Sequence, residues 1–172
     1  MWRVAVGLFL AGLTSAEVRS VCLDDRVGLN SFSRKAFEAE VRELIPVHGL
    51  TLTFGRCLGP AVSIVISAHP PASDARALGL AHRSGDRVLP ALSIYTQPVL
   101  KIIGEQASAA QLGRALARVA AHELGHYLLQ QIHHNHEGLM RASFESSELG
   151  SEDSSRFRQR SANASTEELS LP

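Results

Sequence analysis

The spacing of apolar residues predicts a small sheet in the first hundred residues. Residues 50–57 alternate between apolar and polar side chains, which is the period of a half-buried strand. Residues 62–68 form a short β-branched run suited to a strand buried on both faces. Further strands are predicted at residues 18–23 and 91–96, the last at the sheet edge. Residues 69–90 are rich in proline and glycine and are interpreted as mostly loop.

Two helices accompany these strands. An apolar stripe predicts an amphipathic helix over residues 32–47, with Ser31 or Ser33 as its N-cap. A longer helix is predicted over residues 108–132, which hold no proline and many Ala, Leu, Arg and Gln residues, with Ser108 as its N-cap. The order of elements predicts an α+β or α/β fold: a small mixed twisted sheet, one helix packed across it, and one long helix.

The N-terminus has the three regions of a secretory signal peptide. Arg3 gives a positive start, residues 4–13 are apolar, and small residues precede a cleavage point after Ala16. The apolar run is shorter than the ~20 residues that a permanent membrane anchor needs. Residues 1–16 are therefore predicted to be removed, which leaves a secreted or periplasmic protein without a stable membrane anchor.

Export would give the two cysteines a role. Cys22 and Cys57 are the only cysteines in the chain, and an oxidising compartment would allow them to form a disulfide. The alternative is a pair of buried free thiols that pack as small hydrophobic side chains.

Composition and charge narrow the possible partners. The 172 residues are 45% hydrophobic, and 17 basic side chains balance 17 acidic ones. A neutral chain with no basic stripe gives no electrostatic reason to expect nucleic acid as a partner. The clearest departure from an average composition is eight histidines, five of which fall within residues 122–136.

The central motif is His122-Glu123-Leu124-Gly125-His126, inside the long predicted helix. Residues four apart lie on one helix face, so His122 and His126 can bind one Zn²⁺ together. Glu123 lies beside the first ligand and can take a proton from a zinc-activated water and pass it to a leaving amine. This pattern favours a metallopeptidase in which Glu123 is the general base and acid.

A catalytic zinc site usually has three protein ligands and one open position. If the chain turns back after the helix, a nearby histidine completes the site; if a second helix follows, a more distant glutamate does. A Gly138-Leu139-Met140 turn favours the first arrangement, with the methionine beneath the imidazoles. The candidates for the third ligand are His133, His134, His136, Glu137, Glu145 and Glu148.

Residues 122–142 resemble the active site of metzincin zinc metalloproteases, with their methionine turn. They are most similar to small exported bacterial proteins with a His-Glu-x-x-His helix, a third histidine eight residues on, and a Gly-Ile/Leu-Met-Arg-Ala turn. The resemblance implies that His134 is the third ligand, that Met140 is the turn methionine, and that one Zn²⁺ is bound per chain. It implies a zincin-like fold and hydrolysis of a peptide or protein substrate.

The chain departs from these patterns where the helix should break. Metzincins usually have glycine at the position of Leu129, and the small bacterial group has it at the position of Gln130. Without glycine, the helix is expected to run on to Ile132 and turn at Asn135. The predicted organisation is a signal peptide (1–16), a metzincin-like catalytic domain (17–145) and a disordered, serine- and charge-rich tail (146–172).

A second class of function fits the same residues. The chain could be an inactive relative of metalloproteases, or a metal-binding module that uses the histidines of residues 133–136. Such a protein would bind more than one metal ion per chain, or would bind zinc without hydrolysing peptides.

Overall fold

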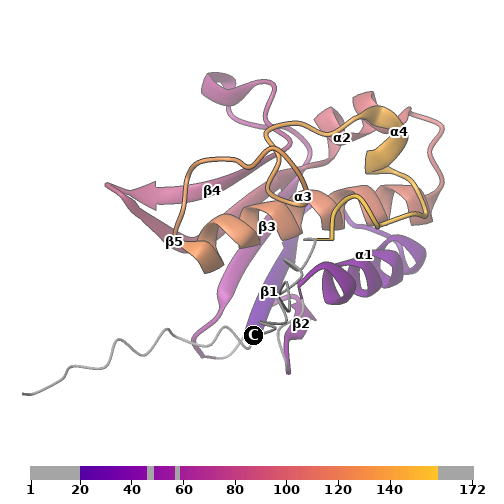
Figure 1. The fold of residues 1–172 in the computed structure, drawn as a ribbon. Helices are drawn as coiled ribbons and strands as arrows, with labels where there is room; N and C mark the ends of the chain where they lie inside the picture. The colour runs from indigo at the N-terminus through magenta and orange to yellow at the C-terminus, as the bar shows by residue number, and fades with distance from the viewer. Residues whose placement is uncertain (1–19, 46–48, 57–58, 159–172) are drawn as a thin grey trace, which may run out of the picture.

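A computed structural model describes residues 20–45, 49–56 and 59–158, which form one sheet with helices packed on it (Figure 1). The strands are β1 (Ser20–Asp25), β2 (Thr51–Phe54), β3 (Val62–Ser67), β4 (Gly79–Ser84) and β5 (Arg87–Tyr95). Their order is β2-β1-β3-β5-β4. The pairs β2–β1, β1–β3 and β3–β5 are parallel, and β4 runs antiparallel to β5. The prediction of a small mixed sheet is thus confirmed.

Strand β4 corrects two expectations. Residues 69–90 were expected to be mostly loop, but Gly79–Ser84 pair with β5 through a turn in which Gly85 has a φ of 59°. Strand β5 therefore lies between β3 and β4 and is not at the edge. The last three residues of β4 are polar and exposed, so the strand lacks the apolar alternation that would have indicated it.

The helices are α1 (Ser31–Leu44), α2 (Thr96–Ile103), α3 (Ala109–Leu129) and the short α4 (Ser146–Leu149), with a 3₁₀ turn at Ala72–Asp74. Ser108 caps α3 as predicted, in a reciprocal capping box with Gln111. The cap of α1 was expected at Ser31 or Ser33, but it is Asn30, whose side-chain oxygen accepts a 3.0 Å hydrogen bond from the Ser33 backbone N–H. Asparagine satisfies this free donor as well as serine does.

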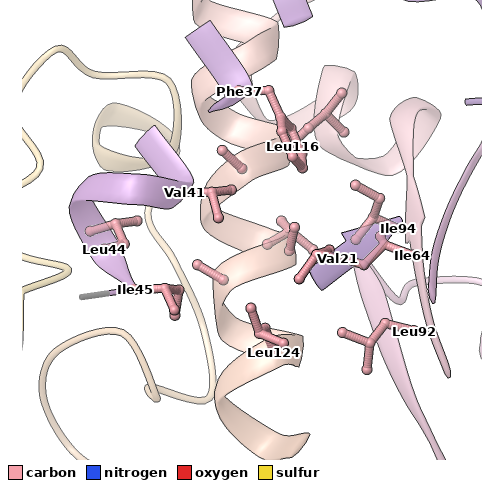
Figure 2. Close-up of a cluster of buried hydrophobic side chains, with 14 of the residues drawn as sticks. Val21, Phe37, Val41, Leu44, Ile45, Ile64, Leu92, Ile94, Leu116 and Leu124 are labelled. Atoms are coloured by element: carbon pink, nitrogen blue, oxygen red, sulfur yellow. The ribbon is translucent and has the colours of Figure 1, made fainter. Parts of the chain in front are cut away.

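The core lies where α1 and α3 pack on each other and on the sheet. Figure 2 shows α1 side chains beside α3, which contributes Leu116 and Leu124, and strand side chains on its other side. The two helices approach so closely at Gly113 that a Cβ there would overlap the backbone carbonyl of Ser33. The parallel register places Leu23, Ile64 and Leu92 side by side under α3. This packing fixes the long helix across the sheet.

The chain beyond α3 differs from the expectation in two places. The helix ends at Leu129 instead of Ile132, and the turn is made by Gln130 in a left-handed conformation. Residues 146–158 were expected to be disordered, but they form α4 and bury Leu149 and Phe157 against the core. The remaining tail residues, 159–172, lie outside the described residues.

Two other predictions also concern residues outside this range. The signal peptide with its cleavage point after Ala16 lies there, and so does Cys57, one partner of the predicted disulfide. No helix within the described part of the chain is long and apolar enough to cross a membrane.

Candidate metal centre

Helix α3 brings His122 and His126 together near its C-terminal end. Both side chains are buried, at 7% exposure each, and their ring centroids lie 4.7 Å apart. The spacing of four residues places both rings on one helix face. The predicted geometry of the first two histidines is therefore present.

His134 approaches the same point from the chain that returns after α3. Its ring lies 5.2 Å from the ring of His122 and 5.0 Å from that of His126, centroid to centroid. One ligand atom from each of the three residues lies within 4.8 Å of the others, so the three histidines lie close enough to hold a metal ion. Among the described residues, this group does not include the other candidates for the third ligand, which are His133, His136, Glu137, Glu145 and Glu148.

Backbone carbonyls fix the orientation of the two helical imidazoles. The Nδ1 of His122 lies 2.7 Å from the carbonyl oxygen of Leu139, and the Nδ1 of His126 lies 2.8 Å from that of Gln131. A carbonyl oxygen only accepts hydrogen bonds, so each Nδ1 carries the hydrogen and each neutral ring keeps its lone pair on Nε2. This is the arrangement in which a carbonyl orients a metal-binding histidine.

The two Nε2 atoms then face each other without a hydrogen between them. They lie 3.1 Å apart. Nitrogens bound at 2.0–2.1 Å to a tetrahedral metal are separated by about 3.3 Å, so the observed spacing fits two corners of such a site. Two lone pairs this close repel each other unless a cation lies between them. The donor set thus fits a metal ion of this kind.

Burial keeps these rings neutral. It lowers the pKa of His122 to about 4, against the opposing hydrogen bond to the Leu139 carbonyl. It also lowers the pKa of His126, where the Gln131 carbonyl acts in the opposite direction. Neutral imidazole is the form that binds metal ions.

Glu123 lies beside the histidines and faces β4. Its side chain is buried, at 8% exposure, and burial raises its pKa to about 7, while a hydrogen bond from the Ala81 backbone acts to lower it. A Cβ on Gly79 would lie 2.7 Å from Oε1 of Glu123, so glycine is required for this close approach of strand and helix. Edge strand β4 thereby holds the carboxylate in place.

The predicted methionine turn lies beneath the helix. Met140 is buried, and its sulfur occupies the space that a Cβ on Gly125 would fill. The preceding carbonyl, of Leu139, is the partner of His122. The ring of Phe144 meets the His122 ring edge-on at 5.5 Å between centroids. The turn therefore supports His122 through the Leu139 carbonyl, and Phe144 packs against the same ring.

A cavity of about 360 Å³ opens onto these residues. It is lined by the three histidines and Glu123, by residues of β4 with Val88 of β5, and by Ile132. The Nε2 atoms and the carboxylate thus face a space that small groups can enter.

A partly buried ionic network adjoins the turn through Arg141, which donates to the Gly138 carbonyl. Arg118, on α3, is fully buried; its Nε donates to Glu40 at 2.7 Å, its other nitrogens donate to the carbonyls of Glu148, Leu149 and Asp153, and its guanidinium lies over the Phe157 ring. The Glu148 carboxylate accepts hydrogen bonds from Arg141 and Arg156 at 2.9 and 2.8 Å. Burial alone would raise the pKa of Glu148, but these bonds and one from the Glu145 backbone outweigh it and lower the pKa.

Sequence reasoning missed four of these contributors: the carbonyls of Leu139 and Gln131, the close approach of Gly79, and Arg118. The signal for Arg118 was an arginine among the apolar positions of α3, four residues before His122. The carbonyls left no signal, because every residue has one.

Comparisons of the chain with protein-family models, with curated proteins and with solved structures found no match.

Proposed function

We propose that this protein is a zinc-dependent metallopeptidase of metzincin-like type. The observation that supports this most strongly is the pair of hydrogen-free Nε2 atoms, 3.1 Å apart and joined by His134, with a carboxylate beside them. Three imidazole nitrogens would hold the metal and would leave a position for water or substrate. That combination is typical of catalytic zinc rather than of closed structural zinc sites.

Each residue has a distinct role in the proposed reaction. The three histidines hold the metal, and the carbonyls of Leu139 and Gln131 keep two of them oriented. When bound, zinc polarises a substrate carbonyl and makes a neighbouring water acidic. Glu123 takes the proton from the attacking water and passes it to the leaving nitrogen, so that the peptide bond breaks as a new carbon–oxygen bond forms.

The edge strand supports a peptide as the substrate class. Strand β4 pairs with β5 on one side only and lies at the end of the sheet, and its residues Gly79 to Ala81 line the cavity. An extended peptide can add to such an edge through main-chain hydrogen bonds, which do not depend on its sequence. A scissile bond held there would lie next to Glu123.

The decisive variant is Glu123→Gln. It keeps the size and burial of the side chain but cannot accept the proton, so we expect one zinc per chain to remain while peptide hydrolysis falls by at least about a hundredfold. Zinc is measured by elemental analysis, and hydrolysis on a mixed peptide library with and without chelator. His122→Ala is the matched control and loses both zinc and hydrolysis.

The same experiment separates the alternative function. Zinc binding by wild type without any chelator-sensitive cleavage would overturn the peptidase and leave a metal-binding module. More than one zinc per chain would point to the histidines of residues 133–136. Export is part of the proposal and is tested separately, because sequencing the N-terminus of the secreted protein should show cleavage after Ala16.

A further inference from the structure

The turn that ends α3 is made by an unusual residue. Gln130 has φ 48° and ψ 39°, and it is the only residue other than glycine with a positive φ in the described part of the chain. Glycine is the usual residue at this left-handed position after a helix, and a side chain there costs roughly 1 kcal/mol or more. A compensating role for the glutamine side chain is therefore expected.

The side chain of Gln130 pairs with the backbone of one residue in β5. Its Oε1 accepts a hydrogen bond from the Val88 N–H at 3.2 Å, and its Nε2 donates to the Val88 carbonyl at 3.1 Å. The same Nε2 donates to the Tyr127 carbonyl at 2.8 Å. Strand β3 pairs with β5 only from Ala91 onward, so the backbone of Val88 has no β3 partner. The amide of Gln130 takes the place that a neighbouring strand would occupy.

The residues on either side of this bridge lead to the candidate metal centre. Next to Gln130, the carbonyl of Gln131 is the partner of His126 Nδ1, and the following residues bring Ile132 and His134 to the cavity. Beyond Val88, the β4–β5 hairpin carries Gly79 and the backbone that contacts Glu123. Gln130 thus joins the end of α3, through Tyr127, to Val88 in the opposite wall of the cavity.

We propose that Gln130 is a positioning residue of the metal centre. Its side chain ties the hairpin to the end of α3, and this tie holds the Gln131 carbonyl on His126 and fixes the distance between the walls of the cavity. The inference rests on the proposed function to the extent that the three histidines bind zinc.

A simpler explanation makes a different prediction. If Gln130 only terminated the helix, glycine would serve as well or better, because it adopts the left-handed conformation without steric cost. If the side chain is needed as a bridge, glycine removes all three of its hydrogen bonds, and the site loosens although the backbone is relieved. The two explanations therefore predict opposite effects of Gln130→Gly.

The test measures zinc affinity by competition with a chromogenic chelator for wild type, Gln130→Gly and Gln130→Met. Methionine keeps the length of the side chain and the backbone cost but forms none of the three bonds. We expect both variants to bind zinc about tenfold more weakly, as is typical when the outer partners of a ligand are lost. Wild-type affinity in Gln130→Gly would overturn the proposal, and if that variant does not fold, wild-type affinity in Gln130→Met would do so.

A second measurement does not depend on metal. Hydrogen exchange in the metal-free protein reports the backbone bonds from Gln131 N–H to the His126 carbonyl and from Asn135 N–H to the Met140 carbonyl. We expect both amides to exchange faster in the two variants than in wild type, and unchanged protection would overturn the positioning role. Absence of zinc binding in wild type would defeat the proposed function instead, and absence of hydrolysis with zinc bound would defeat only the peptidase.

Discussion

Two neighbouring turns of α3 carry buried polar side chains, and they differ in how these side chains are satisfied. Arg118 is completely buried, and protein groups from α1, α4 and the segment after α4 accept its hydrogen bonds. One turn later, His122 and His126 are also buried, but each has only its Nδ1 bonded to a carbonyl. Their Nε2 atoms face each other across 3.1 Å.

The difference separates a polar group that the protein satisfies from a group that can still take a ligand. Buried polar atoms are nearly always hydrogen-bonded, and Arg118 follows this rule entirely within the protein. The two Nε2 atoms face each other, with the His134 ring close by, and two lone pairs cannot bond. The first turn is therefore stabilised by protein groups alone, whereas at the second turn three histidines lie close enough to hold a metal ion.

The largest effect on the free energy of unfolding is expected when Arg118 is replaced. Arg118→Met removes the cation that pairs with the buried Glu40 carboxylate and donates to the carbonyls of Glu148 and Leu149. Loss of one partner of a buried ion pair costs about 3–5 kcal/mol. We expect the free energy of unfolding, measured with urea on metal-free protein, to fall by that amount.

The neighbouring Arg114→Met is the matched control. Arg114 is on the same helix, but its bonds to the Ser151 carbonyl and to the exposed Glu152 are at 3.1 and 3.7 Å. Its replacement should cost about 1 kcal/mol or less. Removing both charges in Arg118→Met/Glu40→Met should recover part of the loss. Equal losses in the two single variants would contradict the distinction between Arg118 and its surroundings.

The next prediction concerns the turn that carries His122 and His126, where zinc is expected to increase the free energy of unfolding. Zinc at a thousand times its dissociation constant should raise the free energy of unfolding of wild type by about 4 kcal/mol, because the unfolded chain lacks the assembled site. His122→Ala and His126→Ala should lose this gain, whereas Glu123→Gln should keep it. Urea unfolding with and without zinc measures each. An equal gain in the histidine variants would mean that zinc binds elsewhere.

The sequence predicts the histidine turn much better than the arginine turn. His122, Glu123 and His126 follow from helical spacing alone, and the resemblance to metzincins selected His134, which the structure brings to the same point. The partners of Arg118 lie 78 residues earlier and about 30 residues later in the chain, and no local pattern links them. The composition of residues 146–158 predicted disorder because their order depends on these long-range contacts.

The fold also divides into elements that local sequence predicts and elements that depend on distant residues. Strands with apolar alternation or β-branched runs were found from their own residues, whereas β4 depends on its pairing with β5 and on the small size of Gly79 beside Glu123. The predicted end of α3 was wrong because Gln130 adopts a left-handed conformation. The hydrogen bonds of its side chain to Val88 offset the cost of that conformation. In each case the missing information lay in a residue distant in the sequence.

The smallest expected effect comes from Arg156. It tests whether an arginine of this network stabilises the fold because it is buried and has several hydrogen-bond partners, or simply because it is charged. Arg156 bonds to Glu148 at 2.8 Å, but its side chain is 67% exposed, whereas Arg141 bonds to the same carboxylate with only 18% exposure. In Arg156→Met, Glu148 keeps Arg141 and the Glu145 N–H as donors. Urea unfolding should therefore show a loss of about 0–1 kcal/mol.

Arg141→Met provides the contrast for this last variant, because it removes the less exposed partner and the side chain that contacts Phe144. It should cost more than Arg156→Met, and because Phe144 meets the His122 ring, it should also weaken zinc binding. A loss in Arg156→Met as large as that in Arg118→Met would contradict this ranking. The network would then depend on each of its charges equally, and the burial of Arg118 would not be what distinguishes it from the exposed members.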